Sequence, residues 1–448
     1  MRIGKPHTHR KTFAAAAVAC LLAAATTLPA QAAGEPAAKA QLAPLVDGMY
    51  PSLESLYKDL HSHPEIAFQE VKTSARLADE MRKLGFEVTE KVGRTGVVAI
   101  YKNGAGPTVL VRTDMDALPM EEKTGLPYAS KVKTESNGRE TFVAHSCGHD
   151  IHMATWVGTA RTLLGMKDQW KGTLMFVAQP AEEIVSGAKA MLDDGLYTRF
   201  GKPDLAFGLH TSPGPYGVVG YRAGPVSSNS DALDITFKGR GGHGSAPDKT
   251  IDPIVIAAHF ITNVQSVVSR EKDPAQFGVV TVGAVQAGTV GNIIPDQAVL
   301  RGTIRSYTPE VREKLLDGVR RTANASAMMA GAPEPSVDLK AGGAAIVNDA
   351  ALVSRTVPAL KAVLGDKNVV EVPPISASED FSEFANAGVP AMFFFVGVYS
   401  PDDIAASRKP GGKPLPFNHS PFFAPVPEQS IKTGVQAMSV AVMTAMAK

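Results

Sequence analysis

Short apolar runs alternate with helix-patterned segments in the first half of the chain, and this alternation restricts the folds available to it. The apolar runs are residues 97–101, 108–111, 174–178 and 205–209, and the helical patterns between them include residues 151–164 and 186–192. Apolar runs without polar alternation are typical of strands that are buried on both faces. The sequence therefore predicts an α/β fold with a mostly parallel sheet and helices on both of its faces.

A second pattern begins near Val226 and ends near Lys340. It has the order strand, helix, strand, strand, helix, strand, which is the order of a ferredoxin-like α+β unit. A chain of 448 residues is long for one domain. We therefore predict a small domain at 226–340 that is inserted into a larger α/β domain formed by residues 33–225 and 341–448.

The N-terminus has the pattern of a signal peptide over residues 1–32. Basic residues precede an alanine-rich apolar stretch at 13–28, and Ala-Gln-Ala at 30–32 is a cleavage site. We expect export to the periplasm or outside the cell; a membrane anchor and lipidation of Cys20 are the alternatives. Cleavage would leave Cys147 as the sole cysteine, either inert or occupied by a metal or by chemistry. The net charge of +1 gives no indication of a nucleic-acid partner.

Ionisable residues follow three of the predicted strands. Asp114 and Asp116 come after the run at 108–111, Glu182 and Glu183 follow 174–178, and His210 follows 205–209. In open α/β sheets, ligands bind outside the carboxyl ends of the strands. The sequence therefore predicts a binding site at this edge of the sheet.

Cys-Gly-His-Asp at 147–150 opens a predicted helix and adds a thiol and an imidazole to these groups. Thiolate, imidazole and carboxylate together suit zinc or a similar first-row dication better than magnesium or calcium. Two such ions would need five or six ligands, one of them bridging. In the adjacent pair Glu182 and Glu183, one carboxylate can bind metal while the other acts as a general base; the alternative is a pair of solvated loop glutamates.

Ten motifs in order give the chain a resemblance to the M20 metallopeptidases, in particular to the branch of hippurate hydrolases, auxin-conjugate hydrolases and N-acyl-amino-acid amidohydrolases. The matching stretches are LHSHPE at 60–65, RTDMDALP at 112–119, CGHD at 147–150, QPAEE at 179–183, GLH at 208–210, GGHG at 241–244, NIIPD at 292–296, GTIR at 302–305, SEDF at 378–381 and NHS at 418–420. Two positions depart from the family pattern: residues 184–187 replace a glycine-rich run, and Ala377 stands where glycine is usual.

The resemblance implies two divalent metal ions per subunit, zinc or else manganese, cobalt or nickel. The implied metal ligands are Cys147, His149, Glu183, His210 and His419. Glu182 would be the general base and proton shuttle. The inserted domain would be a lid and a dimerisation domain, which brings His243 to the partner's site to stabilise the oxyanion. Asn292 and Arg305 would bind the carboxylate of the substrate.

The resulting expectation is metal-dependent hydrolysis of the amide bond of N-acyl amino acids by a homodimer. The alternatives are a dipeptidase or carboxypeptidase of the same family, an exported solute-binding protein, and an amidase with Cys147 and His149 as a nucleophilic pair. We expect Asp116 and Asp150 to orient the ligand histidines, with simple turn aspartates as the alternative. No membrane partner is expected after removal of the signal peptide.

Overall fold

An eight-stranded sheet is the centre of the computed structural model, which describes residues 35–447; the predicted signal peptide lies outside these residues. The strand order is β1-β2-β6-β3-β7-β18-β8-β17. The strands are β1 Glu87–Val92, β2 Gly96–Asn103, β3 Thr108–Asp114, β6 Gly172–Gln179, β7 Leu205–Pro215, β8 Val219–Tyr221, β17 Val369–Glu371 and β18 Ala391–Tyr399. The central strands β6, β3, β7 and β18 are parallel, whereas antiparallel pairs lie toward the edges. The predicted mostly parallel sheet is confirmed.

Successive side chains of the central strands enter different cores. In β3, Val109 and Val111 pack into the core on one face, while Leu110 packs into the core on the other. The first face is covered by α1 Glu35–Ser62, α2 Val71–Lys83, α3 His149–Gly165, α8 Ala350–Leu364 and α11 Pro427–Ala445. The second face carries only the short helices α4 Gly187–Asp193, α5 Leu196–Phe200 and α9 Ser382–Asn386. Burial on both faces explains why the strand sequences lack polar alternation.

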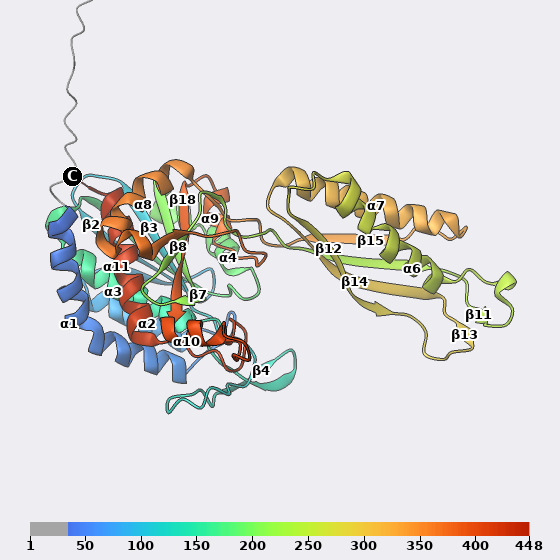
Figure 1. Cartoon of the computed structure of the whole chain (residues 1–448), viewed down its shortest axis with the longest axis horizontal. Helices are drawn as coiled ribbons and strands as arrows, with labels where there is room; N and C mark the ends of the chain where they lie inside the picture. The colour runs from blue at the N-terminus through green and yellow to red at the C-terminus, as the bar shows by residue number, and fades with distance from the viewer. Residues whose placement is uncertain (1–34, 448) are drawn as a thin grey trace, which may run out of the picture.

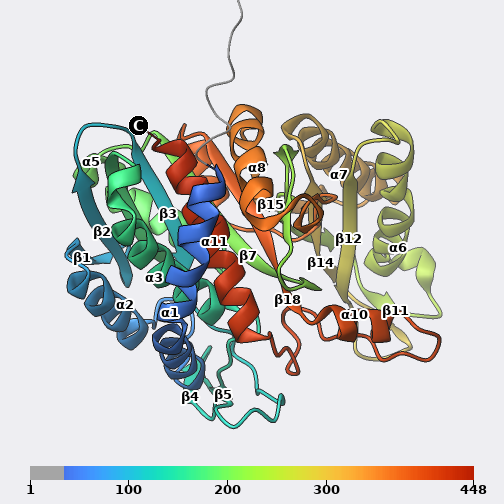
Figure 2. The ribbon, with the colours of Figure 1, turned by 60° about the vertical axis from the view of Figure 1, so that its left-hand side comes forward.

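The long helices form a continuous layer. α1, α3 and α11 lie side by side across the sheet (Figure 2). The remaining elements of the large domain are the hairpin of β4 Lys133–Ser136 and β5 Arg139–Phe142, the pair β9 Gly224–Pro225 and β16 Val347–Asn348, and α10 Pro401–Ser407. Among residues 35–447, no helix is both long and apolar enough to cross a bilayer.

A second, four-stranded antiparallel sheet lies beside the first, with the order β12-β14-β10-β15. Its elements are β10 Asp231–Lys238, α6 Pro253–Asn263, β12 Gly278–Gln286, β14 Gln297–Ser306, α7 Pro309–Met329 and β15 Ser336–Ala341. The two helices start with side-chain caps followed by proline: Asp252 accepts from the backbone of residue 254, and Thr308 from that of residue 311. The unit has its own core around Phe237, Phe260 and Leu315. This is the expected ferredoxin-like arrangement.

The small unit extends away from the large sheet, and the short strands β11 Gly242–His243 and β13 Ile293–Ile294 lie at its far end (Figure 1). At the near end, the two segments that connect the small unit to the large domain are joined by backbone hydrogen bonds. The Val226 amide donates to the Ile346 carbonyl at 2.8 Å, and the Ser230 amide donates to the Gly343 carbonyl at 2.8 Å. These bonds hold the start of the small unit beside the short-helix face of the sheet.

Candidate metal and catalytic site

His149, a predicted metal ligand at the start of α3, follows a residue that must be glycine. Gly148 has φ +92°, and an added Cβ would lie 2.5 Å from the Thr211 hydroxyl oxygen. Only glycine adopts this left-handed conformation freely. The turn therefore lets Cys147 and His149 converge on the carboxyl ends of β3, β6 and β7.

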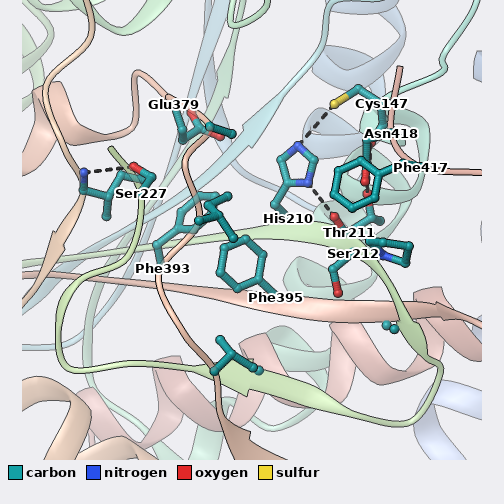
Figure 3. A pocket seen from close by; sticks show the side chains of 18 of the residues that line it. Cys147, His210, Thr211, Ser212, Ser227, Glu379, Phe393, Phe395, Phe417 and Asn418 are labelled. Carbon is teal, nitrogen blue, oxygen red and sulfur yellow. Dashed lines mark hydrogen bonds between the residues drawn. The ribbon is translucent and has the colours of Figure 1, made fainter. Parts of the chain in front are cut away.

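Two histidines, the buried His149 and the half-buried His210, direct Nε2 toward the same space. His149 Nδ1 donates to the Asp116 carbonyl at 2.7 Å, and His210 Nδ1 donates to the Thr211 carbonyl at 2.7 Å. A carbonyl only accepts, so Nδ1 carries the proton and the Nε2 lone pair of the neutral ring is available. Burial keeps the pKa of His210 well below its usual value. His210 Nε2 lies 3.3 Å from Cys147 Sγ (Figure 3).

Two groups of three metal donors share Cys147. The first is Cys147, His149 and His210, and the second is Cys147, Glu183 and His419; within each, the donor atoms lie within 4.8 Å of one another. Glu183 Oε2 is 3.2 Å from His419 Nε2. Burial, with the charges of Glu183 and Glu182, raises the pKa of the Cys147 thiol. A neighbouring cation would ionise it, and a thiolate common to both groups can bridge two dications.

Unpaired buried atoms show that the donor set fits a cation. Within the described part of the chain, His149 Nε2 and Glu183 Oε1 are buried without a hydrogen-bond partner. Burial alone would lower the pKa of His149. The carboxylates of Asp114, Asp116 and Glu183 outweigh this effect and raise the pKa to about 10. The carboxylates around this ring therefore favour a cation at Nε2, either a proton or a metal ion in its place. Thiolate, imidazole and carboxylate donors suit zinc or another first-row dication.

The Glu182–Glu183 turn is held by Asp116, which is itself fully buried. Asp116 Oδ1 accepts the Glu182 amide at 3.0 Å and Oδ2 accepts the Glu183 amide at 2.9 Å. Left-handed residues flank the pair, since Ala181 and Val185 both have φ 51°. Both glutamates therefore face His149 Nε2, with Glu182 Oε2 at 3.7 Å and Glu183 Oε1 at 3.8 Å. Only Glu183 also reaches His419.

Gly187 is required by the close packing of this turn, whereas Val185 stands at a left-handed position that would suit glycine. A Cβ on Gly187 would lie 1.5 Å from the Pro180 carbonyl oxygen, so no other residue fits there. Val185, in the stretch that replaces the family's glycine-rich run, is a β-branched residue in the left-handed region and is strained. Val185 also lines the cavity described below.

Glu182 is placed where it can take up and return a proton. Burial raises its pKa well above the usual value, and the neighbouring carboxylates Glu379, Glu183 and Asp380 raise it further. A carboxylate with a raised pKa holds a proton at neutral pH long enough to deliver it. This arrangement suits the general-base role expected for Glu182.

A buried charge network behind the site was missed from the sequence. Arg112 donates to Asp114 at 2.6 Å, to Glu379 at 2.7 Å and to Gln179 at 2.9 Å. An arginine inside the apolar run of β3 is the signal that could have revealed it, because a buried charge needs partners. Asp380, the residue after Glu379, accepts from the Gln179 side chain at 2.5 Å and from the Ala188 amide at 2.9 Å.

Asp150 does not contact a ligand histidine, contrary to prediction. Its Oδ2 lies 2.6 Å from His61 Nδ1, and its Oδ1 accepts the Ile151 amide at 2.9 Å. His61 Nε2 also contacts Glu122 at 3.1 Å, so this ring bridges two carboxylates. The carboxylate of Asp150 turns back to α1 because His61 offers it a buried cationic partner. His152 is likewise engaged at both nitrogens, by Asp114 and by the Thr211 amide.

The predicted site residues of the small unit divide into two groups. Arg305 lines the cavity beside the metal donors. His243 and Asn292 are exposed at the far end, where the Gly244 amide donates to the Asn292 carbonyl at 2.8 Å. The predicted joint grip of Asn292 and Arg305 is therefore not formed within one chain. The extended strand β14 separates them, since ten residues span roughly 30 Å.

One cavity of about 670 Å³ joins these features. Cys147, Glu182, Glu183, His210 and His419 lie on its polar side, and Arg305 is a further charged group in its lining. The apolar wall includes Val185, Ile346, Val372, Ile375, Phe393 and Phe395. Figure 3 shows the rings of Phe393 and Phe395 beside His210 on this short-helix face of the sheet. The cavity therefore combines metal donors, a proton acceptor and room for an apolar group.

Such a site defines a metal-dependent hydrolase, and the comparisons agree. Residues 110–441 match the model of peptidase family M20/M25/M40, and the chain belongs to this family. It is 38% identical to thermostable carboxypeptidase 2 of Saccharolobus solfataricus over 345 residues, 76% of this chain and 84% of the relative. It is 36% identical to hippurate hydrolase of Campylobacter jejuni over 346 residues, 77% of this chain and 87% of the relative.

A solved structure shows the same fold. The Bacillus subtilis protein YXEP, described as a dinuclear metal-binding peptidase from the M20 family, superposes with a TM-score of 0.74 at 30% identity, covering 89% of this chain and 99% of that one. The chain is therefore an enzyme of a family of hydrolases that act on amide and peptide bonds.

Proposed function

We propose that the protein hydrolyses the amide bond of N-acyl amino acids and releases the amino acid and a carboxylic acid. The observation that carries this proposal is the single cavity that holds metal donors, Glu182, Arg305 and an apolar wall. The five donors Cys147, His149, Glu183, His210 and His419 would hold two divalent ions, in keeping with the dinuclear metal binding described for YXEP.

The chain supplies the proton transfer and the binding. When bound, the dications lower the pKa of water and polarise the amide carbonyl. Glu182 accepts the proton of the attacking water and delivers it to the leaving amine nitrogen. Burial of Glu182 beside Glu379 limits exchange of this proton with solvent. Arg305 pairs with the carboxylate of the amino-acid part.

The apolar wall favours an uncharged acyl group over the free amino end of a peptide. An ammonium group in the cavity would need a carboxylate of its own to compensate desolvation. The acids in the lining are Glu182, Glu183 and Glu379. Glu183 is a metal donor, Glu182 is the proton acceptor, and Glu379 pairs with Arg112. We therefore favour bulky apolar acyl groups, with the dipeptidase or carboxypeptidase activity of the same family as the second candidate because Arg305 would bind a peptide carboxylate equally well.

We further propose that His243 completes the site of a second copy in a homodimer. Its Nδ1 accepts from the Ser245 amide at 3.1 Å, so in the neutral ring the outward Nε2 carries a proton that can be donated to an oxyanion. Exposed Ile254, Val285 and Ile293 on the same unit are apolar surface that a partner would cover. Export, through removal of residues 1–32, is part of the same proposal.

Release of amino acids from N-benzoyl, N-acetyl and dipeptide substrates tests the proposal, before and after chelation and after return of zinc or manganese. We expect metal-dependent release, at least about tenfold faster for benzoyl than for acetyl compounds, because each buried methylene contributes about 0.8 kcal/mol. Faster cleavage of dipeptides would support the second candidate. Release that is insensitive to chelation, or no release with metals bound, would contradict the proposal.

A further inference from the structure

A buried glutamate outside the metal site contacts the turn that carries the general base. Glu70 stands at the start of α2 and is fully buried. Its Oε1 accepts the Ala181 amide at 2.9 Å, and its Oε2 accepts the Thr95 hydroxyl at 2.6 Å. Ala181 directly precedes Glu182, so this carboxylate contacts the backbone one residue from the proton acceptor.

Capping of α2 does not explain Glu70. A glutamate at this position would ordinarily accept amides of the first helical turn, but Glu70 makes no side-chain cap bond. Glu65 performs that role: its Oε2 accepts the Thr73 amide at 2.8 Å and the Thr73 hydroxyl at 2.9 Å, and its Oε1 accepts the Lys72 amide at 3.2 Å. The carboxylate of Glu70 is therefore free to contact the turn.

The bond falls where the backbone is strained. Ala181 has φ 51°, a left-handed conformation that is unfavourable for alanine. Glu70 accepts the amide of this residue, and Asp116 accepts the next two amides, of Glu182 and Glu183. Two buried carboxylates from different parts of the chain thus hold three successive amides. Loss of the Glu70 bond would leave the Ala181 amide buried and unpaired.

We propose that Glu70 is a positioning residue for the reaction: it holds Ala181 in its left-handed conformation and so directs Glu182. The proposal rests on the proposed function, in which Glu182 is the proton acceptor. Asp116 holds the amides of both Glu182 and Glu183, whereas the Glu70 bond holds the residue that directly precedes the base. We expect the length of the Glu70 side chain to affect the position of Glu182 more than its charge does.

Two substitutions of Glu70 separate reach from charge. Glu70→Asp withdraws the acceptor by one methylene, and we expect kcat to fall about 10- to 100-fold with KM within threefold, because small misplacements of a catalytic group cost this much. Glu70→Gln keeps the acceptor in reach and should retain kcat within about threefold. Burial and Asp116 raise the pKa of Glu70 to about 7, so a neutral side chain is compatible with the site.

Glu65→Asp is the matched control, because it shortens the neighbouring helix cap by the same methylene. It should lower the melting temperature and leave kcat unchanged well below that temperature. Bound metal should stay equal in all variants. Hydrogen–deuterium exchange of residues 180–187 gives a readout without substrate: Glu70→Asp should accelerate it about tenfold, as expected for loss of one hydrogen bond worth about 1.4 kcal/mol, and Glu65→Asp should not.

Unchanged kcat and unchanged exchange in Glu70→Asp would overturn the proposal, and so would a loss of kcat that follows loss of metal. If Glu70→Asp does not fold, Thr95→Val, which removes the hydroxyl that orients Glu70, must accelerate exchange of residues 180–187; no acceleration would refute the idea. If the wild-type protein cleaves no substrate, the proposed function fails, while the exchange data still decide the role of Glu70.

Discussion

The two groups of candidate site residues differ in how firmly the fold holds them. On the large sheet, His149, His210 and Glu182 are enclosed, and backbone carbonyls or Asp116 fix their orientation. On the small unit, His243 and Asn292 are exposed at the β11–β13 pair, where the Gly244 amide donates to the Asn292 carbonyl. Within one chain, the first group forms a cavity and the second does not approach it.

The difference shows which part of the chemistry needs only one chain. Strand ends and the start of α3 bring metal donors and the base together through the hydrogen bonds of the large domain alone. Stabilisation of the oxyanion would depend on a donor from elsewhere, which a second copy could supply. We expect substitutions in the first group to abolish metal binding or proton transfer, and substitutions in the second to impair catalysis while leaving metals bound.

The largest effect is expected at the shared donor. Cys147→Ser replaces a thiolate by a hydroxyl that does not ionise near neutral pH, so both donor groups lose a ligand. We expect fewer than two metals per chain by elemental analysis and a fall in kcat of about 10³-fold or more, since the dications supply several kcal/mol. His63→Ala, at an exposed histidine away from the cavity, is the control. Full metal content and activity in the serine variant would show that Cys147 is not a metal donor.

Loss of His243 should be the next largest effect. His243→Ala removes a single oxyanion donor, so kcat should fall about 10²- to 10³-fold with metals retained. The exposed His259 provides a matched histidine-to-alanine control on the same unit.

Mixing of two variant chains tests whether His243 acts on the partner's site. If His243 acts on the partner's site, His243→Ala chains mixed with Glu182→Gln chains should form dimers with one intact site and regain activity. Activity that never returns after subunit exchange would contradict action across the dimer.

Arg305 should affect binding more than turnover. Arg305→Ala removes the charged partner of the substrate carboxylate, and we expect KM to rise about 10- to 100-fold, since a hydrogen bond to a charged group contributes about 1.5–3 kcal/mol. Arg301→Ala on the same strand is the control, because Arg301 is exposed and pairs with Asp234. Steady-state kinetics of both variants test this prediction. An Arg305→Ala KM no higher than the Arg301→Ala KM would show that Arg305 does not bind the substrate carboxylate.

The smallest effect concerns stability and pH. Burial lowers the pKa of His61, but its bonds to Asp150 and Glu122 outweigh this and raise it to about 10. The folded-state pKa exceeds the unfolded value of about 6.5, so this stabilisation is complete below pH about 6.5 and is lost as the pH rises toward about 10. Urea titrations should show a decline of at most about 1.4 kcal/mol per pH unit. In His61→Phe the same decline should be absent.

The sequence predicts the central strands and the donor set better than the edges and the supports. β6 and β18 are continuous apolar runs, whereas β8 and β17 have three residues each and too little pattern to detect. Glu182 stands in a motif, but Glu70 contacts the preceding residue across 111 positions of sequence. Asp150 also follows a ligand in sequence, yet its side chain turns to His61. Tertiary contacts of this kind leave no local signal.

The same limit applies to distance within the small unit. Asn292 and Arg305 stand close in sequence, so a shared role is a natural prediction. The length of β14 separates them in space, because an extended strand moves the chain further per residue than any other element. Residues that are close in sequence at the two ends of an extended strand are therefore far apart in space.

Glu182→Gln, compared with the wild-type protein, tests most directly the claim that the large sheet holds a two-metal hydrolytic centre with Glu182 as its base. Gln has the same size and cannot accept the proton of water. We predict about two metal ions per chain in both proteins, and turnover of the best N-acyl substrate that falls about 10³-fold or more in the variant. Retained turnover, or a variant that has lost its metals, would contradict this assignment.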